Sequence, residues 1–537
     1  MKLSYQGILD VHNYEMNGVK LPAYDWRAMA EKTAAAPTWV HFGAGNIFRG
    51  FIAGLQQRLL NEGEADTGII AAETFDHEII DRIYTPCDCM TLMVALKPDG
   101  TTNLEVISSI ARGLKADCAN VVDWPALCEA FRNPSLQMAS FTITEKGYAT
   151  HNAAGELQPA VVADIANGPL KVHHAMSVAA ALLLERFRSC AAPIAMVSMD
   201  NCSHNGAKLR EAILTIVDGW VEQGYCPAAF AAWVRDETKV AFPWTMIDKI
   251  TPRPAEIICD QLTGLGFSGM QPIITGKGTY IAPYVNAEVP QYLVVEDCFP
   301  NGRPALEKAG VYFCDRETVN KTERMKVTTC LNPLHTALSV YGCLLGYTSI
   351  ADEMRDADLV RLVKAIGYNE GLPVVTDPGI INPRSFIDEV VRQRLPNPFI
   401  PDTPQRIATD TSQKVGIRFG ETIKAYVASA ELDVQCLSAI PLALAGWLRY
   451  LLAVDDNGKP MQCSSDPLLA TLQAQLSGVT LGAPDTLDGK LEPVLRNTNI
   501  FGVDLVEVGL ADKIIGCLKE MLVGPGAVRA TLRKHLA

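Results

Sequence analysis

The stretch MKVTTCLNPLHTALSVYG, from Met325 to Gly342, places one lysine, one asparagine and one histidine in an otherwise apolar sequence that favours a helix. The Lys326 amine can take up or release a proton, the Asn332 amide can donate to a developing oxyanion, and the His335 ring can orient either group. Asn332 and His335 are three positions apart, so they share one face of a helix. Because Pro333 suits the first turn of a helix, we expect Lys326 to precede that helix.

Two interpretations of this stretch remain open from its residues alone. The three polar side chains form a proton-transfer group, or they belong to a capped core helix, since asparagine before proline is a common helix N-cap and a single histidine is often a core residue. The run Val327–Ala351 contains no Asp, Glu, Lys or Arg. Its asparagine, proline and histidine disfavour a membrane span, so we expect a buried helix.

Other polar residues follow predicted strands or lie in a polar loop. Asp200 and Asn201 end the run PIAMVSMDN, and Thr144 ends the run QMASFTIT. Ligands of parallel sheets bind at the carboxyl edge, where such residues meet. Arg406 and Lys414 lie in RIATDTSQK, and their cations suit an oxygen-rich, anionic substrate. Each of these residues also has a structural interpretation as a cap, a turn or a solvated loop.

The segment WVHFGAGNIFRG carries Gly43 and Gly45 after a predicted strand and before a predicted helix. In a dinucleotide fold the first glycine makes a tight turn, and the second lets the backbone approach a pyrophosphate. The usual third glycine is absent, because Phe48 stands in its place, and the neighbouring Arg49 could contact phosphate. The pattern indicates a dinucleotide site, with a plain tight turn as the alternative.

A second apolar run, GIIAAE, ends at Glu73, and Asp76 follows three positions later. An acid at this strand end commonly binds the adenosine ribose and selects NAD over NADP. Glu73 lies 28 residues past Gly45, more than the usual spacing of about 20. A solvated strand end is therefore the alternative interpretation. No basic cluster follows that would hold a 2′-phosphate, so NAD is favoured. The residues we assign to cofactor binding are Gly43, Gly45, Asn46, Arg49, Glu73, Asp76 and Thr144.

The elements that must position these residues are strands that alternate with helices in the first part of the chain, which predicts a doubly wound, Rossmann-type α/β sheet. Pro98-Asp99-Gly100 between two β-rich runs predicts a hairpin that extends this sheet with antiparallel strands. From about Pro304 the pattern is mostly helical. We therefore expect a dinucleotide-binding domain over residues 1–303 and a helical substrate domain over residues 304–537. The expected helices are Thr336–Leu345, Asp352–Ile366, Ser385–Arg394, Gly416–Ser429, Ala439–Val454, Pro467–Gln475 and Val506–Leu522.

Composition excludes several classes of protein. A chain of 537 residues exceeds the size of a single core, so two domains are expected. A net charge of −13 without a basic run argues against nucleic-acid binding. The 15 cysteines show no metal-type pairing, and no HExxH pattern occurs, so we expect no metal site. Scattered cysteines and an N-terminus without a signal-peptide pattern favour a cytoplasmic protein.

Seven segments together resemble the polyol-specific long-chain dehydrogenase/reductase family, also called the mannitol dehydrogenase family. They occur in that family's order over about residues 38–420: HFGAGNIFRG, TITEKGY, SMDNCSHNG, FPWTMIDKITP, VEDCFPNGRPALEKAGVYF, MKVTTCLNPLHTAL and DTPQRIATDTSQK. The resemblance implies NAD-dependent hydride transfer without a metal. Within the family, the segment CLNPLHTALSVYGCLLGY and the N-terminal extension of about 37 residues favour D-mannonate and D-fructuronate as the substrate pair. Altronate with tagaturonate, and mannitol with fructose, are the alternatives.

The same resemblance implies a role for each site residue. Lys326 would be the general acid/base, Asn201 and Asn332 would hold the oxyanion, His335 would orient, and Glu323 would pass the proton to water. Arg406, Lys414 and, less directly, Asp248 would contact the substrate. The family has five steps from lysine to asparagine and this chain has six, so one extra residue must be absorbed in VTTC.

The expected partner is therefore a small sugar acid or polyol, with no nucleic acid and no membrane, and the expected assembly is a monomer or weak oligomer. An unperturbed lysine has a pKa of about 10.4, so a lysine base needs surroundings that favour the neutral amine. The rival class is a non-catalytic nucleotide-binding regulator. Such a protein would lose part of the set Lys326, Asn332, His335 and Asn201, and all four are present.

Overall fold

In the computed structural model, which describes residues 1–536, the predicted strands form a six-stranded, fully parallel sheet in the order β6–β3–β2–β7–β8–β9. All residues of β2, β3, β7 and β8 are buried, as a parallel sheet covered on both faces requires. The strand order reverses between β2 and β7, which is where ligands bind in such sheets. The strands are β2 (Trp39–Phe42), β3 (Ile69–Glu73), β6 (Ile110–Lys115), β7 (Met138–Phe141), β8 (Ile194–Ser198) and β9 (Val240–Ala241).

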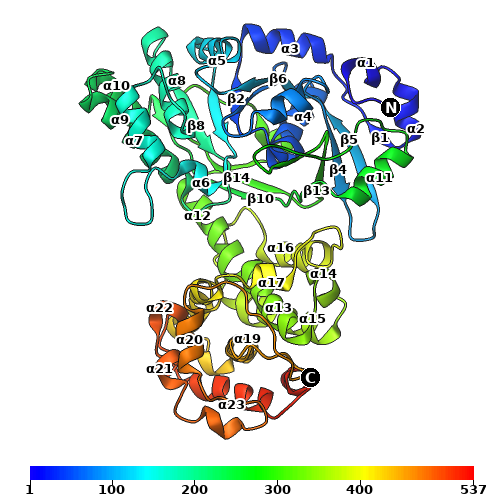
Figure 1. Cartoon of the computed structure of the whole chain (residues 1–537), viewed down its shortest axis with the longest axis vertical. Coiled ribbons are helices and arrows are strands. Elements are labelled where there is room, and N and C mark those ends of the chain that lie inside the picture. The colour runs from blue at the N-terminus through cyan, green and yellow to red at the C-terminus, as the bar shows by residue number, and fades with distance from the viewer. Residues whose placement is uncertain (537) are drawn as a thin grey trace. The chain divides into compact units, whose positions relative to one another are not determined.

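Each face of this sheet packs on its own hydrophobic core (Figure 1). Phe42 and Phe141 belong to the core formed with helices α5 (Asp123–Arg132), α8 (Ala175–Ser189), α9 (Asn205–Glu222) and α10 (Ala228–Arg235). Trp39 and Met138 face the other core, formed with the π-helical η1 (Phe48–Ile52) and its continuation α4 (Ala53–Asn61). Helices on both faces confirm the doubly wound architecture.

The hairpin at Pro98-Asp99-Gly100 is confirmed, since β4 (Thr91–Leu96) pairs antiparallel with β5 (Thr102–Ile107). Its place in the fold differs from the expectation, because it belongs to a separate four-stranded sheet with β1 (Val19–Lys20) and β13 (Tyr284–Glu288). It does not extend the main sheet, because β6, which follows the hairpin in the chain, takes the edge beside β3.

The remaining strands and helices before residue 316 cover these sheets. The strands are β10 (Thr245–Asp248), β14 (Tyr292–Glu296) and β15 (Tyr312–Cys314) in one sheet, with β11 (Ile273–Ile274) and β12 (Tyr280–Ile281) in another. The helices are α1 (Tyr5–Ile8), α2 (Val11–Met16), α3 (Trp26–Ala35), η2 (Ile80–Tyr84), α6 (Thr144–Tyr148), α7 (Pro159–Asn167), α11 (Glu256–Gly264) and η3 (Leu306–Ala309).

The chain divides into two compact units, and the division falls between Asn320 and Lys321. Unit 1 comprises Met1–Leu96 and Thr101–Asn320, and unit 2 comprises Lys97–Gly100 and the chain from Lys321 onward. The expected boundary after residue 303 lies earlier. Residues 304–320 stay with unit 1 because β15 pairs in parallel with β14.

A buried arginine joins several segments of unit 1. Arg186 of α8 is fully buried, and its guanidinium donates to five backbone carbonyls at 2.8–2.9 Å. The acceptors are Phe131, Asn133, Leu136, Ala192 and Pro193. One side chain thereby holds the end of α5 and the starts of β7 and β8 together.

Replacing Arg186 with leucine is expected to lower the free energy of unfolding by about 3 kcal/mol, because several buried carbonyls lose a charged donor. Urea denaturation followed by circular dichroism measures this loss. Arg188→Leu is the matched control, since Arg188 is exposed and makes one long bond of 3.4 Å to the Tyr225 carbonyl. Equal losses in the two variants would contradict the structural role of Arg186.

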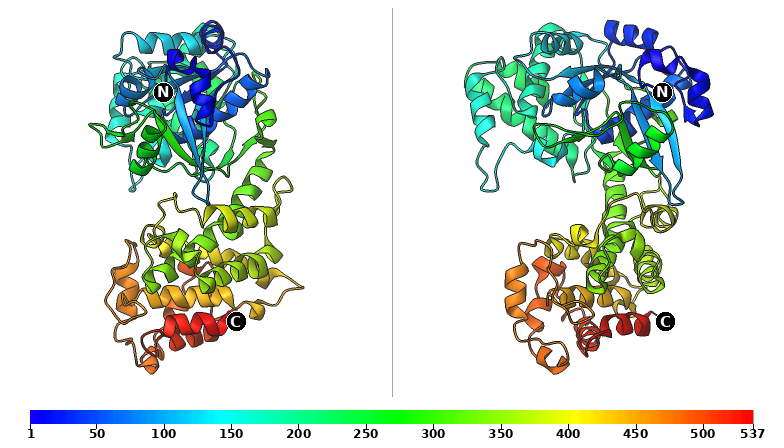
Figure 2. Two further views of the ribbon diagram at one scale, coloured as in Figure 1. Left: turned by 90° about the vertical axis from the view of Figure 1, so that its right-hand side faces the viewer. Right: turned by 45° about the vertical axis from the view of Figure 1, so that its right-hand side comes forward.

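Unit 2 is built from helices, seen in green to red in Figure 2. Each of the seven predicted ranges contains a helix, but Asp352–Ile366 is interrupted between α14 and α15, and the helix expected from Val506 begins only at Ala511. The helices are α12 (Arg316–Met325, which spans the division), η4 (Lys326–Cys330), α13 (Asn332–Leu345), α14 (Ile350–Glu353), α15 (Ala357–Lys364), η5 (Ala365–Gly371), η6 (Leu372–Val374), α16 (Pro383–Glu389), η7 (Val390–Arg394), α17 (Pro404–Ile407), η8 (Thr411–Gln413), η9 (Gly416–Gly420), α18 (Glu421–Ala428), η10 (Val434–Cys436), α19 (Ala439–Tyr450), α20 (Leu469–Gln475), η11 (Pro484–Leu487), α21 (Glu492–Leu495), α22 (Thr498–Phe501), α23 (Ala511–Met521) and α24 (Ala527–His535).

The helix α13, which carries Asn332 and His335, packs on α19 in the core of unit 2. The Tyr341 hydroxyl donates to the Leu442 carbonyl at 2.7 Å, and the missing side chain of Gly446 leaves room for the Tyr341 ring. The buried Glu370 carboxylate accepts three backbone N–H groups at the start of α19, which fixes this helix in turn. The candidate residues of α13 therefore rest on a rigid support.

Candidate active site

A pocket of about 640 Å³ lies at the carboxyl edge of the main sheet, at the reversal point of the strand order. The loops after β2, β3 and β7 form its wall. Of the residues predicted to bind a cofactor, Gly43, Gly45, Glu73, Asp76 and Thr144 line it. These five residues lie together in one pocket, although three different loops supply them.

The two glycines of the first loop differ in what they require. Gly43 has a φ of +101°, and a side chain there would collide with the Thr142 carbonyl of the neighbouring strand end. Gly45 has open space where its side chain would be, so a ligand can approach its backbone. Further along, the absent side chain of Gly50 leaves room for Val285 of β13.

The Glu73 carboxylate is occupied by the backbone of the pocket loops. One oxygen accepts the Ala44 N–H at 2.7 Å, and the other accepts the N–H groups of Phe75 and Asp76 at 2.8 and 3.2 Å. Asp76 differs, because only its Oδ2 is engaged, by the Thr275 hydroxyl at 2.5 Å. Its Oδ1 has no hydrogen-bond partner within the described chain. Glu73 therefore shapes the pocket, and Asp76 retains an acceptor.

The loop after β7 is held by Asp200, at the end of the neighbouring strand β8. Asp200 accepts the N–H groups of Ile143 and Thr144 at 2.7 and 3.2 Å and the Tyr148 hydroxyl at 2.6 Å. Burial raises the pKa of Asp200, and these three donors oppose that rise. Thr144 adopts a φ of +64°, rare for a threonine, and Asp200 stabilises it there.

Arg49 and Asn46 do not line the pocket. Arg49 is fully buried, and its guanidinium donates to the Ala282 carbonyl at 2.8 Å, to the Thr91 hydroxyl at 3.3 Å and to Asn46 Oδ1 at 3.0 Å. The predicted phosphate contact of Arg49 is therefore not supported by the geometry, because the π-helical turn of η1 directs this side chain into the core. The sequence missed other lining residues, among them Phe75, Thr142 and His173. Phe75 lies between Glu73 and Asp76 in the sequence, and this position could have indicated that Phe75 lines the pocket.

In unit 2, Lys326 is the first residue of the π turn η4, directly before α13, and is only 3% exposed. The Leu331 N–H donates to the Lys326 carbonyl at 3.1 Å, five residues back. A π turn is how one extra residue is accommodated within a helix, and such turns are frequent at functional sites. The π turn covers KVTTC, the segment in which the resemblance placed an additional residue between Lys326 and Asn332.

The N-cap position of α13 is Leu331, so Asn332 is the first residue inside the helix, and its side chain has no hydrogen-bond partner within the described chain. The interpretation of Asn332 as a simple helix cap is therefore wrong. His335 follows one turn later, with its Nε2 3.5 Å from Asp402 Oδ2. Burial lowers the pKa of His335 well below 6.5, against the opposing charge of Asp402. The ring is therefore neutral near pH 7, and it can donate one hydrogen bond and accept another.

Asp402 connects His335 to the predicted substrate cation. Its Oδ1 pairs with the Arg406 guanidinium, while its Oδ2 faces His335. Sequence reasoning missed Asp402, although its spacing of four residues before Arg406 was a usable signal. The loop also holds Lys414, whose amine donates to the Thr409 carbonyl and whose pKa is lowered by burial and by Arg418.

Arg418 is a second residue that the sequence did not indicate. It donates to the Thr336 hydroxyl on α13, and burial lowers its pKa to about 10. The remaining predicted residues are placed as follows. Glu323 is half-buried on α12, one turn before Lys326, whereas Asn201 and Asp248 follow β8 and end β10 in unit 1.

Within residues 1–536, no three His, Cys, Asp or Glu side chains are grouped so that they could hold a metal ion. None of the helices described is both long enough and apolar enough to cross a membrane.

The sheet order, the glycine turn and the pocket define a Rossmann-type dinucleotide-binding protein with a helical C-terminal domain. The mannitol dehydrogenase Rossmann domain model matches residues 37–308, and the mannitol dehydrogenase C-terminal domain model matches residues 318–521. The chain therefore belongs to the mannitol dehydrogenase family.

Individual members of the family are similar over the whole chain. D-mannonate oxidoreductase of Thermotoga maritima is 52% identical over 99% of this chain and 99% of its own length. The substrate-free structure of D-sorbitol dehydrogenase has a TM-score of 0.78 and 25% identity, covering 96% of this chain and 97% of that one. Mannitol 2-dehydrogenase of Pseudomonas fluorescens, solved with NAD and D-mannitol, has a TM-score of 0.68 and 27% identity, with 99% of both chains covered.

Proposed function

We propose that this protein is an NAD-dependent, metal-independent oxidoreductase that interconverts D-mannonate and D-fructuronate. The observation that carries the proposal is the 52% identity, over essentially the full length, to an enzyme named D-mannonate oxidoreductase. The structure described here supports it with a pocket that fits a dinucleotide: a turn at Gly43, an open backbone approach at Gly45 and an available acceptor on Asp76.

The residues of unit 2 supply the acid–base chemistry in this proposal. Bound NAD would supply the nicotinamide C4, which takes the hydride from the alcohol carbon in oxidation and returns it in reduction. As that carbon loses hydride, the neutral amine of Lys326 takes the hydroxyl proton, so the alcohol becomes a carbonyl. The Asn332 amide donates to the oxygen while it carries negative charge. Glu323 passes the proton from Lys326 to water.

The cations of the loop after α17 suit the carboxylate of a sugar acid. Arg406 and Lys414 lie eight residues apart and would bind the anion, with Asp402 orienting Arg406 and His335. Asn201 and Asp248, which belong to unit 1, are proposed to contribute a second oxyanion donor and a substrate contact. All fifteen cysteines, each within the described residues, are free, which supports a cytoplasmic location as part of the proposal.

The test is NADH consumption, measured by absorbance, with fructuronate, tagaturonate, fructose and fructose 6-phosphate offered in parallel. We expect fructuronate to be reduced with the highest kcat/KM. Preference for tagaturonate would assign altronate and tagaturonate as the substrate pair, and preference for fructose would assign mannitol and fructose. Consumption with none of the four would favour a non-catalytic nucleotide-binding protein.

The available oxygen of Asp76 leads to a prediction about the cofactor. Asp76→Asn is expected to raise the Kd for NADH about tenfold, because a charged acceptor for the ribose hydroxyls becomes a neutral one. Fluorescence titration of NADH measures the change. Glu78→Gln is the control, since Glu78 lies two residues away, bonds to Gly276 and Arg82, and does not line the pocket. An unchanged Kd in Asp76→Asn would remove Asp76 from the cofactor site.

A further inference from the structure

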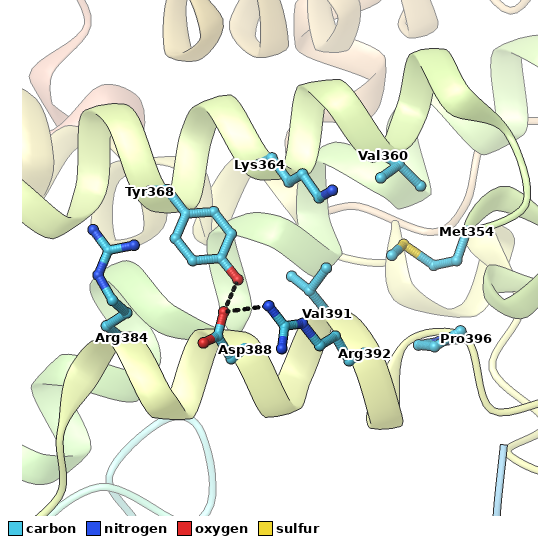
Figure 3. Close-up of a pocket in the computed structure, with 9 residues that line it drawn as sticks. All are labelled: Met354, Val360, Lys364, Tyr368, Arg384, Asp388, Val391, Arg392 and Pro396. Atoms are coloured by element: carbon cyan, nitrogen blue, oxygen red, sulfur yellow. Dashed lines mark hydrogen bonds and ion pairs between the residues drawn. The ribbon is translucent and has the colours of Figure 1, made fainter.

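A groove of about 460 Å³ in unit 2 has no part in the chemistry described above. It runs between the helix α15–η5 and the helix α16–η7 (Figure 3). Lys364, Arg384 and Arg392 contribute three cations to its lining, and Asp388 contributes one carboxylate. On a chain with a net charge of −13, this local excess of positive charge marks a site suited to an anion.

These cations are only weakly neutralised by the protein. Lys364 and Arg384 have no carboxylate partner within the described chain, and the Arg384 guanidinium lies over the Tyr368 ring at 5.6 Å. Arg392 lies 3.7 Å from Asp388, longer than a hydrogen bond, and its side chain is 75% exposed. Exposed pairs of this kind contribute little, so the donors of Arg392 remain available to a ligand.

Asp388 and Tyr368 form a fixed polar pair in the middle of the groove. The Tyr368 hydroxyl donates to Asp388 Oδ1 at 2.6 Å, and burial together with this bond raises the pKa of Tyr368 to about 12. The hydroxyl therefore stays protonated and holds Asp388 in place. Figure 3 shows the Arg392 guanidinium extending toward this pair, whereas Lys364 projects from the opposite helix toward Val360.

The other end of the groove is apolar. Met354, Val360 and Pro396 line it, to the right of the cations in Figure 3, and Val391 lies between Lys364 and Arg392. The groove thus combines a cationic half with an apolar half, and its volume exceeds that of a single inorganic anion. A ligand that matches both halves carries a strongly charged anionic group on a less polar organic body.

We propose that this groove binds a small phosphate monoester, with Lys364 and Arg392 as donors to the phosphate and the organic group against the apolar end. A phosphate monoester carries a charge of about −1.5 to −2 at pH 7, which matches the excess charge of the groove better than a single carboxylate does. Arginine and lysine are the side chains that bind phosphate most strongly. This inference does not depend on the substrate proposed above.

The probe for the test is phenyl phosphate, added to the full-length protein with saturating NADH so that the cofactor pocket is filled. Isothermal titration calorimetry at constant ionic strength is expected to show one site per chain, with binding about tenfold tighter than for inorganic phosphate or benzoate. Each comparison compound lacks one of the two proposed interactions. Inorganic phosphate has no organic group for the apolar end, and benzoate carries only a single negative charge for the cations.

The variants Lys364→Gln and Arg392→Gln are each expected to weaken phenyl phosphate binding about tenfold, because each removes a charged donor. Neither residue belongs to the proposed catalytic set, so turnover without the probe should stay unchanged. Arg355→Gln is the matched control, since Arg355 is an exposed cation of unit 2 that pairs with Asp352 outside the groove. Absence of saturable binding, displacement of the probe by NADH, or equal weakening in Arg355→Gln would each overturn the proposal.

Discussion

Replacing Lys326 with alanine is expected to reduce turnover about 10³-fold while leaving the affinity for NADH unchanged. Loss of a general acid or base typically costs 10²–10⁴ in rate. The cofactor pocket is built from loops of unit 1, whereas Lys326 lies in the π turn of unit 2, so the substitution leaves the pocket intact. Steady-state kinetics with fructuronate, together with NADH fluorescence titration, separate the two quantities.

Two further variants distinguish proton transfer from a structural role of Lys326. Lys326→Arg keeps the positive charge, but arginine is not deprotonated in proteins, so turnover should fall as far as in the alanine variant. Added methylamine should restore part of the activity of Lys326→Ala, because it supplies the missing base. Lys424→Ala is the control, since Lys424 is an exposed lysine of the same unit that pairs with Glu421. Full activity in Lys326→Ala would refute the assignment.

Replacing Glu353 with glutamine is expected to stabilise the protein, and the gain should grow with pH. Glu353 is completely buried, and neither carboxylate oxygen has a hydrogen-bond partner within the described chain. Burial raises its pKa to about 9, and the charge of Asp356 adds to the rise. Its carboxyl group packs against the backbone of α13 at Gly342, two turns beyond His335, and interacts with the Cys343 thiol.

The sign of this effect follows from proton binding. An unfolded glutamate titrates near pH 4.3, so between about pH 4.3 and pH 9 the folded state holds a proton that the unfolded state has released. Stability from Glu353 is therefore fully present below the unfolded pKa and is lost as the pH rises toward 9. Glutamine has no such proton, so at pH 8 the variant should be more stable by up to about 5 kcal/mol.

Urea unfolding of Glu353→Gln and of the unmodified protein at pH 6, 7 and 8 measures this difference. Asp352→Asn is the matched control, because Asp352 neighbours Glu353 on α14 but is exposed and pairs with Arg355. A gain that is the same at all three pH values would show that the effect comes from packing and not from the proton. No gain at any pH would mean that Glu353 is charged in the folded protein.

Much of the fold was predictable because its signals are local. Short, continuous apolar runs such as GIIAAE and PIAMVSMD are typical of strands in a parallel sheet that is covered on both faces. The helical ranges of unit 2 follow from the periodicity of their apolar residues. Gly43 was predictable for the same reason, since its positive φ excludes other residues. The resemblance of seven short segments identified the family, and the catalytic set around Lys326 is the prediction that follows from it.

What remained undecided depends on contacts between residues far apart in the chain. Arg49 looked like a phosphate ligand, but Ala282, more than two hundred residues away, provides its acceptor. The hairpin was read correctly from Pro98-Asp99-Gly100, yet its sheet was decided by pairing with β13.

By itself, the sequence determined the alternation of strands and helices, the glycine turn, the family and the residue types available for catalysis. Only the tertiary structure decided which polar groups are already engaged: Glu73 by backbone amides, Arg49 by the Ala282 carbonyl and two side-chain oxygens, and Asp402 by Arg406. It also showed that Lys326 begins a π turn directly before α13. The physical reason is that backbone preference is set by neighbours in the chain, whereas a buried charge or donor is satisfied by whatever folding brings beside it.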